Sequence, residues 1–299
     1  MRLVTYTLDN ETRLGAQKGD GIVDLNAADS ALPADMLSLL QGGDDLMAKA
    51  SAVVAAAEPT IALADVTLES PIPNPPRIFA IGLNYLDHYY EIPEEIRVGK
   101  GIGIPKVPVV FNKQTLTVAG PAAPIYVPPE SDQLDYEAEL GVVIGKTCRR
   151  VAKADAAKVI AGYTVLNDVT VRDWQIASPT MTMGKSWDGH CPMGPVLVTP
   201  DEVDDAENLT VRTLVDGEEL QNFNTSDMIF KIADQIAHLS TAFTLLPGDV
   251  IATGTSQGVA LFRPNHPWLK PGQVCQVEIE SIGTLENPVM VDPGHSFIR

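Results

Sequence analysis

Residues 135–144 read DYEAELGVVI, and this short run decides how the middle of the chain folds. Along a β-strand, residues two apart point to the same side. Glu137 and Glu139 therefore share one face, whereas the other face carries only apolar side chains, those of Ala138, Leu140, Val142 and Ile144. The pattern predicts a strand with its apolar face in a core and a pair of carboxylates on the opposite face.

A second strand-like run, GYTVLNDVT at residues 162–170, ends in Asn167 and Asp168. Neighbouring carboxylates repel each other unless a proton or a cation lies between them. If Asp168 joins the Glu137 and Glu139 pair, three oxygen ligands suit a hard divalent ion and leave positions open for water or substrate. Such ligands favour Mg²⁺ or Mn²⁺, with Ca²⁺ as a further possibility. Taken alone, the glutamate pair also fits a solvated strand face.

The composition of the sequence changes at residues 69–77, which read ESPIPNPPR. Four prolines in nine residues cannot form a helix interior and favour an extended linker. The chain of 299 residues is long enough for two unequal domains. We therefore predict a small N-terminal α+β domain at residues 1–70 and a larger β-rich domain at residues 71–299.

Local patterns predict the elements within each domain. Residues 1–25 indicate short antiparallel strands joined by turns, followed by helices at 33–40 and 44–57. After the linker, short apolar runs such as RIFAIG, PVVF, VLVT and QVEIE are separated by Gly and Pro. This pattern of short strands is typical of a barrel or sandwich. Two helices are predicted to interrupt it, at 153–160 and 227–243, and Ser226 or Thr225 is the expected N-cap of the second. The predicted fold class is α+β and mainly β.

The charge balance limits the partners of the chain. There are 21 Lys and Arg residues against 39 Asp and Glu residues, a net charge of -18. Such a protein repels phosphate backbones and anionic lipids, so neither a nucleic acid nor a membrane is an expected partner. Three scattered cysteines without a CxxC pair indicate reduced thiols. With no signal-peptide core and no long apolar run, we expect a cytoplasmic protein.

Seven segments in order resemble the signature of the fumarylacetoacetate hydrolase family. They are IGLNYLDHYYE, FNKQT, LDYEAELGVVIGK, GYTVLNDVTVRDWQ, GKSWDGHCPMGPVLVT, NTSDMIFKIADQIAHLSTAFTLLPGDVIATGT and QGVALFRPNHPWLKPGQVCQVEIESIGTLEN. The resemblance covers residues 77–290. It implies a mixed β-sandwich roll or barrel, a homodimer, and a metal site formed by Glu137, Glu139 and Asp168.

The resemblance also implies roles for five other residues. His88 and Glu91 stand in a His-x-x-Glu segment that resembles a lid, where the glutamate orients the imidazole and the histidine takes a proton from water. Without the resemblance, this pair is an ordinary exposed helix pair. Lys185 matches a catalytic lysine near the metal. Gln175 and Thr255 match polar positions that line the substrate pocket.

The implied activity is metal-dependent hydrolysis of a carbon–carbon bond in a β-diketone or an acylpyruvate-type 2-oxo acid, through a metal-bound enolate. The alternatives are a 2-oxo acid decarboxylase, an isomerase or tautomerase, or a hydratase on the same scaffold. A non-catalytic metal-binding protein is less favoured, because a pure binder has no need of His88 and Glu91. Leu83 and Ser256 replace the Arg and Pro usual in relatives, which leaves the identity of the 2-oxo acid or dicarbonyl substrate open.

Overall fold

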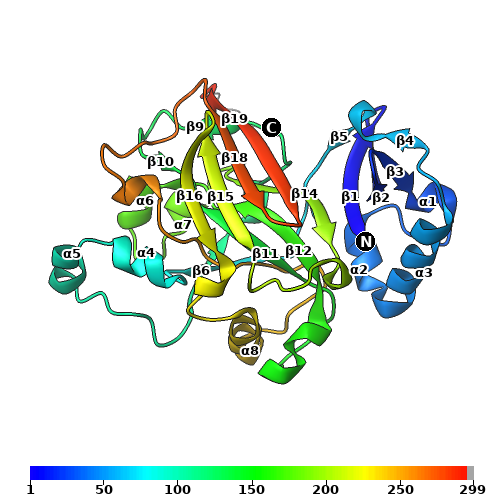
Figure 1. Ribbon diagram of the computed structural model, residues 1–299, viewed down its shortest axis with the longest axis horizontal. Helices are drawn as coiled ribbons and strands as arrows, with labels where there is room; N and C mark the ends of the chain where they lie inside the picture. Colours follow the sequence, from blue (N-terminus) through cyan, green and yellow to red (C-terminus); the bar gives the residue numbers. More distant parts are fainter. Residues whose placement is uncertain (295–299) are drawn as a thin grey trace.

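The computed structural model describes residues 1–294 and contains two main β-sheets (Figure 1). Within these residues the larger sheet has 12 strands, ten of them in the order β4-β3-β2-β1-β14-β12-β11-β17-β6-β7. Its strands are β1 (Arg2–Leu8), β2 (Glu11–Lys18), β3 (Gly21–Asp24), β4 (Ile61–Ala62), β5 (Thr67–Leu68), β6 (Ile78–Gly82), β7 (Val109–Lys113), β8 (Val118–Ala119), β11 (Ala138–Ile144), β12 (Ile160–Asn167), β14 (Cys191–Val198) and β17 (Val250–Ala252).

The second sheet has five strands in the order β16-β15-β18-β19-β9 over the same described range. It lies in front of the larger sheet in Figure 1. Its strands are β9 (Ile125–Val127), β15 (Thr210–Val215), β16 (Glu218–Asn224), β18 (Val274–Ile279) and β19 (Gly283–Val291), and a separate pair is formed by β10 (Leu134–Asp135) and β13 (Thr170–Val171). A continuous apolar core joins β11 and β12 of one sheet to β15 and β18 of the other. The mainly β fold that the sequence predicts is therefore present.

Helices are short and lie around the sheets (Figure 1). The α-helices are α1 (Leu25–Ala28), α2 (Met36–Gln41), α3 (Gly43–Ala56), α4 (Leu86–Glu91), α5 (Glu94–Gly99), α6 (Arg172–Ile176), α7 (Thr182–Lys185) and α8 (Ile232–Ala242). Short 3₁₀ turns are η1 (Leu63–Asp65), η2 (Thr115–Thr117), η3 (Lys153–Val159), η4 (Pro200–Glu202), η5 (Thr225–Asp227) and η6 (Ala260–Phe262). In residues 1–294, none of the helices combines the length and the apolar character needed to cross a membrane.

Two helix predictions were wrong in detail. The predicted helix at 227–243 begins only at Ile232, and its N-cap is Lys231 rather than Thr225 or Ser226. The preceding backbone is held extended, because the Ile229 N–H donates to the carbonyl of Asn84 at 2.7 Å. The segment predicted as a helix at 153–160 is the 3₁₀ turn η3.

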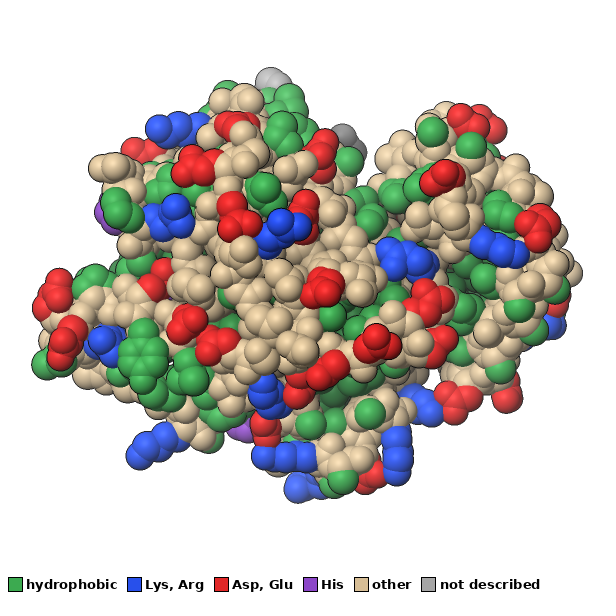
Figure 2. All heavy atoms as spheres, viewed as in Figure 1, with side chains coloured by type: hydrophobic (Ala, Val, Ile, Leu, Met, Phe, Trp, Pro, Cys, Tyr) green, Lys and Arg blue, Asp and Glu red, His purple; other side chains and the backbone are tan. Residues whose placement is uncertain are grey.

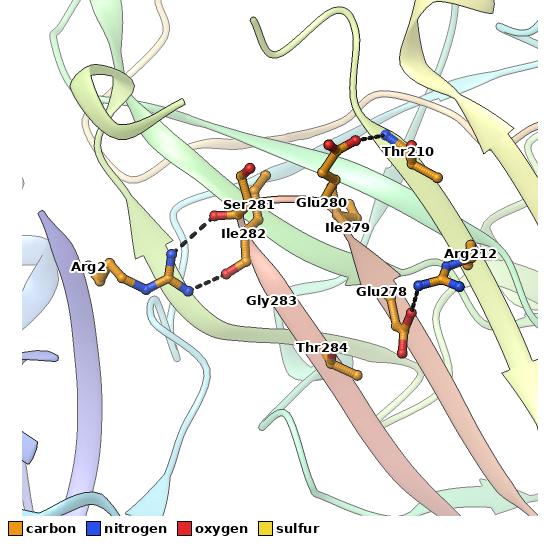
Figure 3. Close-up of a pocket in the computed structure, with 10 residues that line it drawn as sticks. All are labelled: Arg2, Thr210, Arg212, Glu278, Ile279, Glu280, Ser281, Ile282, Gly283 and Thr284. Carbon is orange, nitrogen blue, oxygen red and sulfur yellow. Dashed lines mark hydrogen bonds and ion pairs between the residues drawn. The ribbon is translucent and has the colours of Figure 1, made fainter. Parts of the chain in front are cut away.

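The N-terminal strands continue the larger sheet, since β1 pairs antiparallel with β14 through Arg2 opposite Val198. The Arg2 guanidinium also crosses to the turn between β18 and β19, donating to the carbonyls of Ser281 at 3.1 Å and Ile282 at 2.5 Å (Figure 3). An open hollow of about 640 Å³ lies here, and the space-filling view is indented beside the N-terminal lobe (Figure 2). The division into domains at residue 70 stays a prediction.

Candidate active site

Three buried carboxylates meet where β11 and β12 run side by side. Glu139 pairs with Leu166 across the two strands, and the Asp168 N–H donates to the carbonyl of Glu137 at 2.9 Å. Glu137, Glu139 and Asp168 each offer an oxygen, and these atoms all lie within 4.8 Å of one another. The apolar side chains of β11 face the core between the sheets, as the period of two predicts. The carboxylates are not a solvated face, because none is more than 5% exposed.

The spacing of these oxygens suits a divalent ion. Two oxygens on opposite sides of Mg²⁺ or Ca²⁺ are about 4–5 Å apart, since each lies about 2.0–2.6 Å from the metal. The ligand set is oxygen only, which favours a hard cation over zinc. Glu139 also has a free oxygen, because within residues 1–294 its Oε2 alone accepts a hydrogen bond, from the Gly254 N–H at 2.7 Å. The residues present therefore fit a bound Mg²⁺ or Mn²⁺.

Three buried cations surround the carboxylates. Lys185 Nζ donates to Glu137 Oε2 and to Asp168 Oδ2, at 2.7 Å each. Lys113 Nζ forms an ion pair with Asp168 Oδ1 at 2.6 Å, and Arg172 pairs with Glu137 Oε1 at 2.7 Å. Each carboxylate oxygen has a second lone pair, so these cations can orient the ligands while leaving them able to coordinate an ion.

The three cations form their ion pairs with Glu137 and Asp168. The pKa values of Glu139 and Asp168 are therefore shifted in opposite directions. Burial raises the pKa of Glu139 well above its usual value, and the charges of Asp168 and Glu137 raise it further. Burial also acts to raise the pKa of Asp168, but Lys113 and Lys185 outweigh it and hold that pKa below its usual value. Glu139 is thus the one carboxylate of the triad that forms no ion pair with a lysine or arginine of residues 1–294, and it gains most from a metal ion.

A histidine–glutamate pair lies on α4, beside the same loop that contacts Glu139. His88 Nδ1 is 2.5 Å from Glu91 Oε1, as their spacing of three on a helical turn predicts. Glu91 Oε2 accepts from the Gly258 N–H at 2.8 Å. Gly254, which binds Glu139, and Gly258 are four residues apart, a span of at most about 14 Å. One loop therefore connects the His88–Glu91 pair to the carboxylate triad.

The segment just before α4 is hydrogen-bonded to this loop through Asn84. Asn84 Nδ2 donates to the carbonyl of Thr253 at 2.7 Å, and Asn84 Oδ1 accepts from the Phe230 N–H at 2.9 Å. Gly254 turns with a φ of +102°, and an added Cβ would lie 2.8 Å from Asn84 Cβ. Only glycine fits this turn, and the turn aims its N–H at Glu139.

The sequence profile described as "Fumarylacetoacetate (FAA) hydrolase C-terminal" matches residues 77–290, most of the chain and all of this site. The chain belongs to the fumarylacetoacetate hydrolase family. It is 40% identical over 296 residues to an oxaloacetate tautomerase of Xenopus laevis named as mitochondrial, covering 97% of this chain and 90% of that protein.

Solved structures of other family members share the fold. One is the maleylpyruvate hydrolase of Sphingobium sp. SYK-6 in complex with manganese(II) and pyruvate, which is 32% identical, with a TM-score of 0.80 over 97% of this chain and 99% of that one. Another is a 5-carboxymethyl-2-hydroxymuconate delta-isomerase of Mycobacterium smegmatis, which is 30% identical, with a TM-score of 0.75 over 98% and 100% of the two chains. The chain is therefore a member of a metal-dependent enzyme family that includes tautomerases, hydrolases and isomerases.

The two residues that the family resemblance suggests for substrate contact lie at the edges of the site. Gln175 Oε1 accepts from Arg172 at 3.0 Å, which connects it to the cation beside Glu137. Thr255 directly follows Gly254, and its Oγ1 accepts from the buried Gln221 at 3.0 Å. Helix α7 packs directly on α6 at Gly184. A Cβ added there would lie only 2.2 Å from the backbone nitrogen of Gln175, so a larger residue would not fit.

The sequence analysis did not single out Lys113 and Arg172, which form ion pairs with Asp168 and Glu137. Lys113 lies in FNKQT and Arg172 in VRDWQ, so both fall inside the segments that carry the resemblance. Arg172 also donates through Nε to Asp135 Oδ2 at 2.8 Å, and Asp135 accepts from the Ala260 N–H at 2.8 Å. The signal available was position within a motif, since a lone lysine or arginine has no distinguishing pattern.

Replacing Lys113 is expected to destabilise the metal-free protein. Its side chain is wholly buried against Asp168, and removing one partner of a buried pair costs about 3 kcal/mol or more. Lys113→Met should lower the free energy of unfolding by about that amount in EDTA, and by less in saturating Mg²⁺, which restores a cation beside Asp168. Urea unfolding measures both. Lys158→Met, at an exposed pair with Asp155, is the control, and an equal effect of the two substitutions would contradict this role.

Proposed function

We propose that the protein is a divalent-metal-dependent keto–enol tautomerase that acts on a short 2-oxo dicarboxylate such as oxaloacetate. The likeness to an oxaloacetate tautomerase across 97% of the chain favours this alternative over hydrolysis. The observation that supports this chemistry best is the His88–Glu91 pair. Glu91 is hydrogen-bonded to the same loop that contacts Glu139. Tautomerisation needs one group that moves a proton between carbon and oxygen, and this pair supplies it.

The metal would be held by Glu137, Glu139 and Asp168. When bound, a divalent ion supplies Lewis acidity that orients the 2-oxo acid and stabilises charge on its carbonyl oxygen. Lys185 uses two of its three N–H groups on Glu137 and Asp168, so the third can be directed at that oxygen. These contacts would fix the substrate carbon that bears the mobile proton.

His88 carries the proton in this proposal. Its Nδ1 is engaged by Glu91, which leaves Nε2 as the nitrogen that meets the substrate. Nε2 takes a proton from C3, the C3–H electron pair becomes the C2–C3 double bond, and the carbonyl oxygen gains the electrons of its π bond. The oxygen is then protonated to give the enol, and the same steps run backwards to give the ketone. Glu91 stabilises the charged imidazole formed between these steps.

Carbon–carbon hydrolysis is the second candidate, because the chain is also 32% identical to a maleylpyruvate hydrolase. A comparison of two substrates separates the candidates. The protein with Mg²⁺ or Mn²⁺ should accelerate the enol–ketone interconversion of oxaloacetate more than the cleavage of maleylpyruvate to maleate and pyruvate. Faster cleavage of maleylpyruvate, with both products identified, would make hydrolysis the better assignment.

A further inference from the structure

A second cavity, lined by aromatic rings, lies next to α7, and none of Glu137, Glu139 and Asp168 lines it. It has a volume of about 400 Å³, within the range of small-molecule sites. Trp174 lies within α6, and Trp187 lies two residues beyond the end of α7. Their rings meet edge to face, with centroids 5.1 Å apart. Tyr126 of β9 and His190 complete the aromatic wall.

His190 contributes an uncharged ring to the lining of this cavity. The residue is 2% exposed, and its Nε2 lies 2.8 Å from the carbonyl of Tyr126, so Nε2 carries the proton. Burial lowers the pKa of His190 to about 4, and the ring is neutral at pH 7. Nδ1 is then a bare acceptor, and it is buried without a hydrogen-bond partner within residues 1–294. Because Nδ1 is closed to solvent, His190 offers the cavity a neutral ring that does not repel an organic cation.

The rim of the cavity is acidic. Glu130, Asp188 and Asp292 line it, and no lysine or arginine does so among the described residues. Three carboxylates repel an anion, so this cavity does not suit the 2-oxo acid of the proposed reaction. Aromatic faces beside carboxylates attract organic cations, because the ring face is the negative part of its quadrupole.

We propose that this cavity binds a protonated organic amine. The carboxylates at the rim balance its charge, and its apolar body lies against Trp174 and Trp187. The assignment is independent of the proposed tautomerase activity, since it uses none of the residues assigned to that reaction.

Tryptophan fluorescence and calorimetry test this assignment with benzylammonium as the probe. Two of the three tryptophans of the chain line the cavity, so a saturable fluorescence change is expected, and it should persist in Trp268→Phe. Benzyl alcohol, a neutral analogue of similar shape, should bind about tenfold more weakly. Benzoate at equal ionic strength should not bind.

Two variants locate the site by calorimetry. Trp187→Leu should weaken benzylammonium about tenfold by removing a ring face. Asp188→Asn is at an exposed position where folding is not at risk, and it should weaken binding about two- to threefold. The assignment is overturned if benzylammonium gives no saturable signal, if benzyl alcohol binds equally well, or if Asp188→Asn binds benzylammonium as tightly as the wild type does.

Discussion

Glu139→Gln is expected to make the metal-free protein more stable while abolishing its response to metal. Glu139 is buried beside Asp168 and Glu137, it forms no ion pair within residues 1–294, and its pKa is raised. A carboxyl group whose pKa is higher in the folded state than in the unfolded state destabilises the fold near neutral pH, and the penalty disappears as the pH falls and the group binds its proton. Glutamine removes the charge and keeps an oxygen for the Gly254 N–H.

The same substitution should remove the metal's contribution. A ligand at 100 times its dissociation constant stabilises the folded state by about 2.7 kcal/mol, and this increment should be lost in Glu139→Gln. Activity should fall by about 10³-fold, because Lewis-acid stabilisation is worth several kcal/mol. Thermal unfolding from neutral to acidic pH, in EDTA and in Mg²⁺, measures each effect. Glu218→Gln, at an exposed position on β16, is the control. A variant that keeps the full Mg²⁺ shift would show that Glu139 is not a ligand.

His88→Asn is expected to lower tautomerisation by about 10²- to 10⁴-fold, the usual contribution of a general acid–base group. The Mg²⁺-induced shift in melting temperature should stay unchanged, since His88 is not among the carboxylates of the triad. Any decarboxylation of oxaloacetate should fall much less, because that reaction needs an electron sink rather than a base. The ratio of the two activities at fixed Mg²⁺ is the measurement.

The matched control for this substitution is His238→Asn, which changes an exposed histidine on α8. It should leave both activities as they are. If tautomerisation and decarboxylation fall together in His88→Asn, His88 acts in substrate binding or lid closure, and its role as the proton carrier must be given up.

Patterns local in sequence predicted the parts of this site that depend on local geometry. The period of two in DYEAELGVVI placed Glu137 and Glu139 together, and the spacing of three placed His88 against Glu91. Both follow from strand and helix geometry alone. The apolar stripe of α8 was likewise found from its period, with Ile232, Ile236 and Leu239 buried.

Features that depend on distant contacts could not be predicted in this way. The start of α8 was misplaced because the Ile229 and Phe230 N–H groups bind Asn84, about 145 positions earlier in the chain. The contact of Glu91 with Gly258 joins residues 167 positions apart. Lys113, the last residue of β7, pairs with Asp168, 55 positions later, although β7 and β12 are not neighbours in the sheet. Tertiary contacts of this kind override local preference.

The proposed tautomerase needs both a metal ion at the carboxylate triad and His88. The most direct measurement is the rate of ketonisation of enol-oxaloacetate by stopped-flow absorbance, as the EDTA-stripped protein is titrated with Mg²⁺. The rate should rise saturably above that of Mg²⁺ in buffer, with the same midpoint as the Mg²⁺-induced rise in melting temperature. A rate no faster than buffer with Mg²⁺, or a rate that does not depend on the metal, would contradict the account.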